Sequence, residues 1–382
     1  MREYLLVLAV AAAVTYLCTG FTRRFALRFG AITPLRDRDV HVIPMPRLGG
    51  LAIMLGVGTA ILVAQHLPFL SRIPEVGHDA TALLAGASVM FVVGAVDDFH
   101  ELDGVTKLAG QVVAAGVIVV MGVKFYWLPT PGGIFSMPPV LGAVLSAIVI
   151  IATANAVNFV DGLDGLAAGV CVIGALAFFS YAYLLAFDNG LNRAAPPSLI
   201  AVAVAGSCLG FLPYNFHPCK LFMGDSGALP LGTLLGGAAV NLTGFLDPGT
   251  AAVSGGNATW LPVLLPLILT VAVLALPGID LVLAVIRRTK EGRSPFSSDR
   301  GHLHHRMLDM GHSHRGSVLL LWAWAAVIGF GIVLIVLRGG VVMISAVSLA
   351  VVGLLLGTLV TPTRLRRRRR HRDRRESLPR VG

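Results

Sequence analysis

The feature that most constrains this chain is a series of eleven apolar windows that carry little or no charge. Each is roughly 16–25 residues long, the length that an α-helix needs to cross the hydrocarbon core of a bilayer. Apolar residues make up 55% of the sequence and charged residues only 13%, which is not the composition of a soluble domain. We therefore expect an all-α, polytopic integral membrane protein with about eleven transmembrane helices. The expected spans are 4–20, 48–67, 80–96, 108–123, 134–154, 166–187, 194–212, 228–246, 260–286, 317–337 and 340–360.

The distribution of lysine and arginine predicts how these spans are oriented. When the segments between the windows are assigned alternately to the two faces, 25 of these residues fall on one face and 5 on the other. Because basic residues accumulate on the cytoplasmic side of membrane proteins, we expect the richer face to be cytoplasmic. The N-terminus is then outside and the C-terminus inside, in a multi-pass protein of the plasma membrane.

The basic C-terminal segment is expected to lie outside the membrane domain. Residues 361–382 contain 10 arginines and follow the last apolar window directly. Like charges beside a membrane exit are typical of a disordered cytoplasmic tail that contacts anionic lipid. No aromatic residues are interleaved with these arginines, so nucleic-acid binding is not expected. We therefore divide the chain into a single transmembrane domain, 1–360, and this tail.

Acidic and amide side chains form three strings, all on the expected cytoplasmic face. Charged groups are costly beside hydrocarbon, so such strings indicate a site that binds a cation, a phosphate or both. Hard oxygen ligands of this kind suit Mg²⁺, and also Mn²⁺, better than Zn²⁺. An acidic pair is also common as a helix cap or a solvated turn, and this interpretation stays open for the first string. The strings are Asp97-Asp98, then Asn155, Asn158, Asp161 and Asp164, and finally Asp225.

A fourth polar string is rich in arginine and histidine. Its donors suit the oxygens of a diphosphate or a sugar, especially beside acidic strings that bind metal. Three histidines also allow a zinc site, but their spacing is poor for one helical face and no cysteine lies near. Lys107, at the start of the fourth window, supplies a fixed positive charge that suits phosphate. The string contains Arg300, His302, His304, His305 and Arg306.

Together these motifs resemble those of the polyprenyl-phosphate N-acetylhexosamine-1-phosphate transferase family. The resemblance extends over most of the chain, in the motifs HVIPMPRLGG, VDD, NAVNFVDGLDGLAAG, FMGDSGALPLG, PGIDLVLAVIRR and SPFSSDRGHLHHRM. It implies ten or eleven transmembrane helices, an active site at the cytoplasmic face, a requirement for Mg²⁺ and a homodimer. Members that use UDP-MurNAc-pentapeptide usually carry three consecutive histidines. Here the string reads GHLHHR, which is similar to bacterial undecaprenyl- and decaprenyl-phosphate GlcNAc-1-phosphate transferases.

The reaction implied by this resemblance transfers GlcNAc-1-phosphate from UDP-GlcNAc to a membrane polyprenyl phosphate. The products are polyprenyl-diphospho-GlcNAc and UMP, and the lipid product begins a cell-wall or surface polysaccharide. One alternative is the phospho-MurNAc-pentapeptide transferase of peptidoglycan synthesis. An alternative of a different class is a transporter or flippase for a phosphorylated solute or lipid, which would place functional charge near the middle of the membrane.

The resemblance also implies roles for individual residues. Asp225 and Asn158 match metal ligands, and Asp97 and Asp98 match an acidic pair beside the lipid phosphate, where we expect the catalytic groups. Asp164 matches a position near the uracil. The remaining residues of the expected substrate site are Lys107, Asn155, Asp161, His41, Arg47, Arg300, His302, His304, His305 and Arg306.

Overall fold

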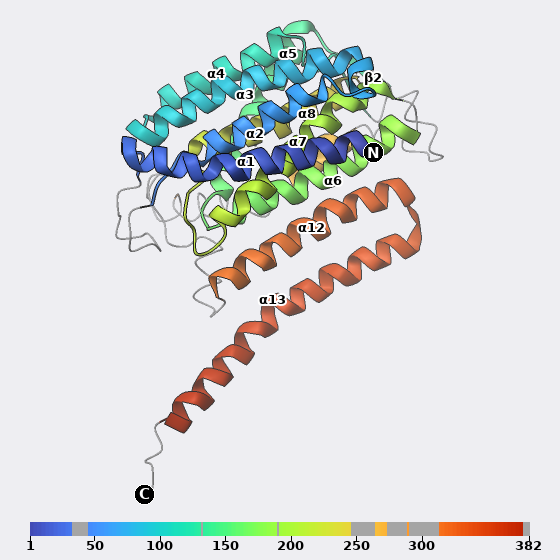
Figure 1. Cartoon of the computed structure of the whole chain (residues 1–382). Helices are drawn as coiled ribbons and strands as arrows, with labels where there is room; N and C mark the ends of the chain where they lie inside the picture. The colour runs from blue at the N-terminus through green and yellow to red at the C-terminus, as the bar shows by residue number, and fades with distance from the viewer. Residues whose placement is uncertain are drawn as a thin grey trace, which may run out of the picture.

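The structure of the chain is a computed structural model, which describes residues 1–32, 45–130, 133–188, 191–245, 264–272, 289 and 313–376. The described residues form a bundle of long helices with an outer helical pair (Figure 1). The α-helices are α1 (Arg2–Phe29), α2 (Gly49–Ala64), α3 (Pro74–His100), α4 (Gly104–Val120), α5 (Pro139–Val160), α6 (Leu166–Asp188), α7 (Ala195–Asn215), α8 (Asp225–Phe245), α12 (His314–Arg338) and α13 (Gly340–Glu376). Two short 3-10 helices are η1 (Leu70–Arg72) and η2 (Asn192–Ala194).

Within the described part of the chain, seven helical segments are long and apolar enough to cross a membrane. They are α1, α3, α5, α6, η2 with α7, α12 and the first part of α13, while α2 and α4 are apolar but shorter. Helices suit this environment because they satisfy their own backbone hydrogen bonds where no water is present. The expectation of an all-α membrane protein is confirmed. The total of eleven spans stays a prediction, because the ninth window, 260–286, is described only at 264–272.

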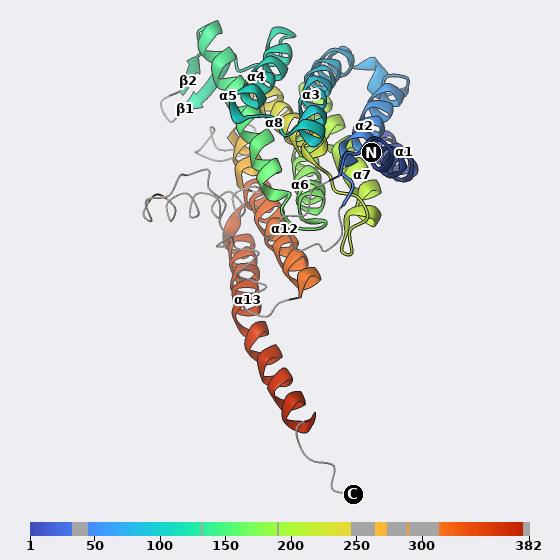
Figure 2. The same cartoon turned by 90° about the vertical axis from the view of Figure 1, so that its left-hand side faces the viewer.

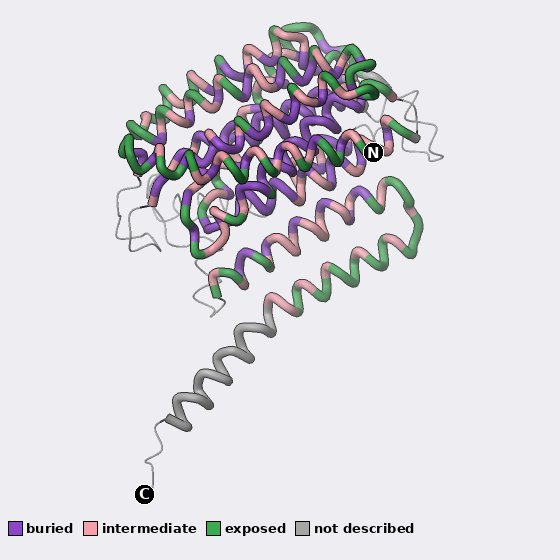
Figure 3. The backbone as a smooth tube through the Cα atoms, in the orientation of Figure 1, coloured by how far each residue is buried: buried purple, intermediate pink, exposed green. Residues whose placement is uncertain are grey.

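Burial decreases from the centre of the bundle to its edge (Figure 3). At the centre, 89% of the apolar window of η2 and α7 is buried, and α7 packs against α1, α2 and α6. Next to it, α8 packs against α3 and α5. At the edge, α12 packs on α6 and α13 packs on α12, and 0% of the apolar window of α13 is buried (Figure 2). An apolar helix with this exposure fits contact with lipid rather than with water.

Two elements differ from the sequence-based expectation. A short antiparallel hairpin joins α4 to α5, with β1 (Trp127–Thr130) paired to β2 (Gly133–Ser136). The fifth span was expected from Ile134 but begins at Pro139, since proline is favoured in the first turn of a helix and residues before it favour extended backbone. At the other end of the chain, α13 continues to Glu376, past the boundary at which a disordered tail was expected. Arginine is a good helix former, so a helix that begins in the apolar span can continue into the arginine run.

The loops on one side of the bundle are tied together by long-range hydrogen bonds. Arg23 near the end of α1 donates from Nε to the carbonyl of Lys220, which precedes α8, at 3.1 Å. The amide of Phe222 donates to the carbonyl of Pro46, which precedes α2, at 2.9 Å. Consequently the ends of α1 and α7 and the starts of α2 and α8 meet at the same end of the bundle.

Candidate active site

The first turn of α8 is held by a carboxylate from another helix. Asp98 of α3 accepts hydrogen bonds from the backbone amides of Asp225, at 3.0 Å, and Ser226, at 3.1 Å, one on each carboxylate oxygen. The first amides of a helix have no partner within the helix, and a negative charge there is favourable. The buried Asp98 side chain is therefore a cap for α8, which is the alternative that the sequence left open for the acidic pair.

Two glycines let neighbouring helices approach this turn at backbone distance. A Cβ atom on Gly94 of α3 would lie 2.3 Å from the carbonyl oxygen of Asp225. A Cβ atom on Gly50 of α2 would lie 2.0 Å from the carbonyl oxygen of Ser226. Any larger side chain at either position would collide with main-chain atoms, so α2 and α3 fix the position of Asp225 directly.

The Asp225 side chain points into a cluster formed by four helices. Asn158 of α5 donates from Nδ2 to Asp225 Oδ1 at 2.7 Å. Lys107 of α4 forms an ion pair with Asp225 Oδ2, and its Nζ also lies 3.4 Å from Asp97 Oδ2. The other oxygen of Asp97 accepts from the amide of Leu102 at 3.0 Å. The structure thus brings together Asp97, Lys107, Asn158 and Asp225, four residues that the sequence analysis placed in the site.

Asp161 adds a further carboxylate to this cluster. Its desolvation, together with the negative charges of Asp225 and Asp98, raises the pKa of Asp161 to about 7. The amide of Gly224 and the positive charge of Arg47 act in the opposite direction but are weaker. The predicted site residue Asp161 therefore lies within electrostatic reach of both Asp225 and the predicted site residue Arg47, and the net effect of its surroundings disfavours its negative charge.

The predicted residue Asn155 is paired with a residue that the sequence analysis did not single out. Its Nδ2 donates to Gln111 Oε1 of α4 at 2.7 Å, and Gln111 Nε2 donates back to Asn155 Oδ1 at 3.2 Å. The Asn155 amide also donates to the carbonyl of Ile151 at 2.8 Å. This reciprocal pair joins α4 to α5 one helical turn from Asn158, so Asn155 supports the position of the site residues.

Asp164 belongs to a second polar cluster. The ring of His217 lies 2.8 Å from Asp164 Oδ2 through Nδ1, and the amide of Cys219 donates to the same oxygen at 3.3 Å. His314 Nε2 lies 3.9 Å from this oxygen. Neither histidine was singled out from the sequence, because each becomes a neighbour of Asp164 only through tertiary contact.

The other predicted site residues lie outside the described part of the chain. They are His41, Arg300, His302, His304, His305 and Arg306. Their assignment to the substrate site stays a prediction. The described segment that follows the arginine and histidine string in the sequence begins at Ser313, directly before α12.

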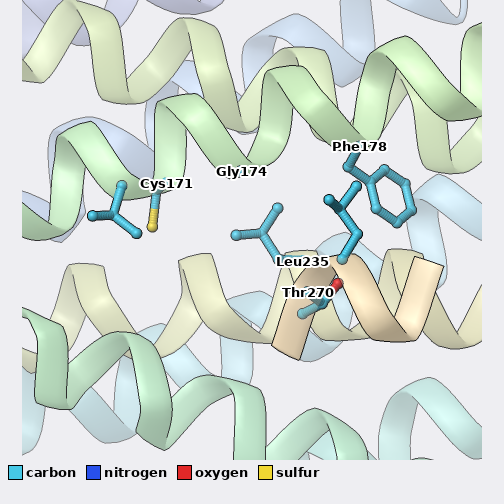
Figure 4. A pocket seen from close by; sticks show the side chains of 7 residues that line it. Cys171, Gly174, Phe178, Leu235 and Thr270 are labelled. Atoms are coloured by element: carbon cyan, nitrogen blue, oxygen red, sulfur yellow. The ribbon is translucent and has the colours of Figure 1, made fainter. Parts of the chain in front are cut away.

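A small apolar hollow lies away from these charged clusters (Figure 4). Its walls include Cys171 and Phe178 of α6, Leu235 of α8 and Thr270 of the segment 264–272. No acidic or basic side chain lines it among the described residues. Among the described residues, this hollow therefore offers no charged side chain to a phosphate or a metal ion.

Comparison with known proteins agrees with this geometry. Residues 80–243 match the model for glycosyl transferase family 4, a range that contains Asp97, Lys107, Asn158 and Asp225. A curated relative, decaprenyl-phosphate N-acetylglucosaminephosphotransferase of Mycolicibacterium smegmatis, is 44% identical over 335 residues, which cover 87% of this chain and 82% of the relative. The chain belongs to glycosyl transferase family 4.

Two further relatives within this family are named for different activities. The probable undecaprenyl-phosphate N-acetylglucosaminyl 1-phosphate transferase of Bacillus subtilis is 33% identical over 338 residues, 88% of this chain and 85% of the relative. A phospho-N-acetylmuramoyl-pentapeptide-transferase of Mycobacterium bovis is 33% identical over 275 residues, 63% of this chain and 76% of the relative. The GlcNAc-type relatives therefore match a larger share of this family member.

Proposed function

We infer that this protein transfers GlcNAc-1-phosphate to a polyprenyl phosphate in the membrane. The observation that carries this inference is the 44% identity, over 87% of the chain, to a decaprenyl-phosphate N-acetylglucosaminephosphotransferase. The four-helix cluster around Asp225 supports it, because its acids, amide and lysine suit a reaction between phosphates. We propose UDP-GlcNAc as the donor and UMP as the leaving product.

In the proposed reaction, a terminal oxygen of the lipid phosphate attacks the β-phosphorus of UDP-GlcNAc. A new P–O bond forms, the bond from the β-phosphorus to the bridging oxygen breaks, and UMP leaves with the electron pair. A phosphate monoester has a second pKa near 6, so it is mostly dianionic at neutral pH and needs little help from a base. The larger barrier is the approach of two anions, and the Lys107 ammonium between Asp97 and Asp225 is placed to reduce it.

We propose that a divalent cation, Mg²⁺ or alternatively Mn²⁺, binds at Asp225 and Asn158. The donor set fits such an ion, since carboxylate and amide oxygens are its preferred protein ligands. The Lys107 ammonium, which contacts two carboxylates of the cluster, supports this fit because it marks where positive charge is stabilised. When bound, the ion would supply charge neutralisation to the diphosphate and to the leaving UMP.

The two neighbouring aspartates are proposed to have different roles. Both oxygens of Asp98 accept backbone amides of α8, so Asp98 is proposed to position Asp225. Asp97 contacts Lys107 with one oxygen and accepts one backbone amide, that of Leu102, with the other, so it is the better candidate to orient the lipid phosphate or accept a residual proton.

We further propose that this polar end of the bundle faces the cytoplasm. The support is the bias of lysine and arginine along the sequence, together with the joining of the loops before α2 and α8 at one end. The homodimer and the contact between the basic tail and anionic lipid stay predictions.

The test is an assay of the purified full-length protein in detergent. Labelled UDP-GlcNAc and a short polyprenyl phosphate should yield UMP and a diphospholipid only when both substrates and Mg²⁺ are present. Replacing UDP-GlcNAc by UDP-MurNAc-pentapeptide should abolish product formation. Turnover of the pentapeptide donor alone would favour the alternative transferase, and an absence of UMP under all conditions would favour a transporter or flippase.

A further inference from the structure

Three residues that commonly bind transition metals converge beside the start of α6. Asp164 precedes α6, His217 follows α7, and His314 is the first residue of α12. One ligand atom from each residue lies within 4.8 Å of the others. These residues are far apart in the sequence, so the fold itself creates the cluster.

The cluster is enclosed and its members are held by their surroundings. The side chains of Asp164 and His314 are 2% and 10% exposed, while that of His217 is 35% exposed. The two imidazole rings stack with centroids 4.4 Å apart. Arg315 donates from Nε to the carbonyl of His217 at 3.1 Å, which ties α12 to the loop after α7. The partly exposed His217 provides a path by which an ion can enter.

We propose that Asp164, His217 and His314 form a binding site for a transition-metal ion of the Zn²⁺ class. Zinc is bound at about 2.0–2.2 Å by histidine nitrogen and carboxylate oxygen, so the ligand atoms around a tetrahedral ion lie roughly 3.3 Å apart. The distances to Asp164 Oδ2, 2.8 Å for His217 Nδ1 and 3.9 Å for His314 Nε2, lie on either side of that value. A ring nitrogen binds an ion in the plane of its ring, so the stacked rings of His217 and His314, at an interplanar angle of 24°, must turn before both nitrogens point to one ion. The more exposed His217 side chain is the one that would turn.

The ligand types separate this site from the cluster around Asp225. Two imidazoles with one carboxylate favour Zn²⁺, Co²⁺ or a similar ion, whereas Asp225 and Asn158 offer only oxygen to Mg²⁺. Three protein ligands leave a fourth position for water or another donor. The proposed ion would join the start of α6, the loop after α7 and the start of α12. Because the resemblance places Asp164 near the uracil, this ion would bind at the nucleobase end of the proposed donor site.

Binding of Co²⁺ alone to the full-length protein in detergent tests the proposal without using turnover. The protein is first stripped with a chelator, and the visible absorption of tetrahedral Co²⁺ is then followed during titration. We expect one Co²⁺ per chain at this site, displaced by Zn²⁺ but not by excess Mg²⁺. His217→Ala and His314→Ala should each weaken this binding at least about tenfold.

His78→Ala is the matched control for these variants. His78 also contacts a carboxylate, with its Nδ1 2.9 Å from Asp79 Oδ1, but no third metal ligand joins this pair among the described residues. The control should therefore bind Co²⁺ as the unaltered protein does. A second control, H302A/H304A/H305A, should likewise keep the absorption band. Loss of the band in either control, or its survival in both H217A and H314A, would overturn the proposal.

A spectroscopic measurement on the unaltered protein covers the case in which a variant fails to fold. X-ray absorption at the zinc edge of the Zn²⁺-loaded chain should show nitrogen and oxygen neighbours with the multiple scattering of two imidazoles. Sulfur in the ion's coordination shell, or no imidazole, would exclude this cluster as the site. His314→Gln, which keeps a polar side chain of similar length, serves as a milder variant and should also lose the band.

Discussion

The two ends of the α3 and α8 pair hold buried acids in contrasting surroundings. At one end, Asp79 accepts from Asn241 Nδ2 of α8 at 2.9 Å and contacts His78 at 2.9 Å, so each of its oxygens has a partner of its own. At the opposite end, the carboxylates of Asp97 and Asp225 share the ammonium of Lys107.

This difference indicates that Asp79 supports the fold, whereas the cluster around Asp225 has the charge arrangement of a ligand-binding site. A buried carboxylate with local donors is compensated within the protein, and its role is complete when the helices pack. Burial, and after it the negative charges of Asp225 and Asp98, raise the pKa of Asp161, and a cation bound among such carboxylates would relieve their repulsion. In this helix pair, Asp79 therefore stabilises the packing at one end, and the cluster around Asp225 forms the candidate active site at the other.

The largest contrast should come from removing one acid at each end. Asp225→Ala should lower kcat/KM for UMP release by about 10²–10³-fold, because it removes the proposed metal ligand and a partner of Lys107. Asp79→Asn should lower the melting temperature but change kcat/KM by less than about twofold. Substantial Mg²⁺-dependent activity in Asp225→Ala would remove this residue from the metal site.

A methyl group added to α3 at the active-site end should lower the melting temperature and the turnover far more than one added at the opposite end. Gly94→Ala places Cβ 2.3 Å from the carbonyl oxygen of Asp225, and relieving such a collision costs about 1–3 kcal/mol. We expect a lower melting temperature together with reduced turnover. Gly77→Ala is the matched control in the same helix, since nothing lies within 4 Å of its Cβ position. Equal melting temperatures for the two variants would show that α3 and α8 are not packed as described.

The neighbouring acids of the active-site end should give different phenotypes. Asp97→Asn should lower kcat by about 10²-fold with little change in melting temperature, because Asp97 contacts Lys107 and caps no helix. Asp98→Ala should cost about 1.5–3 kcal/mol of stability by removing a charged acceptor from the first turn of α8. If Asp97→Asn and Asp98→Asn both kept near-native turnover with unchanged nucleotide binding, neither acid would be the base.

The smallest effect concerns pH. Asp161 has a pKa of about 7 in the folded protein against 3.8 when unperturbed, so the folded state holds its proton more tightly. Its contribution to stability is complete below pH 3.8 and is lost as pH rises through about 7. In metal-free buffer, the melting temperature should therefore fall between pH 5 and roughly pH 8, and Asp161→Asn should reduce this slope. An unchanged slope would show that Asp161 does not titrate in this range.

The sequence predicted the helices well because the length of an apolar window can be read along the chain without knowledge of its tertiary contacts. The described helices coincide with ten of the eleven windows, and the ninth is described only in part. The hairpin before α5 was not predicted, since Gly133–Ser136 reads as part of an apolar window and only its pairing with Trp127–Thr130 makes it a strand.

Site residues at the ends of the apolar spans could be predicted from the sequence. Residues whose roles depend on tertiary contacts could not. Lys107, Asn158 and Asp225 were recognised because polar residues there are expensive near lipid. Asp97 and Asp98 were not separable from the sequence, because consecutive helical residues point in directions about 100° apart and meet different neighbours. His217 was missed altogether, since its partner Asp164 is 53 residues away.

The position of Lys107 affects how the proposed divalent cation would bind. Its ammonium already serves as an internal counter-ion for Asp97 and Asp225, so the proposed divalent ion would not enter a bare pair of anions. If that ion binds, the lysine would give up a carboxylate and could turn toward an incoming phosphate. Asp97 and Asp225 would then have a positively charged neighbour both before and after the ion binds.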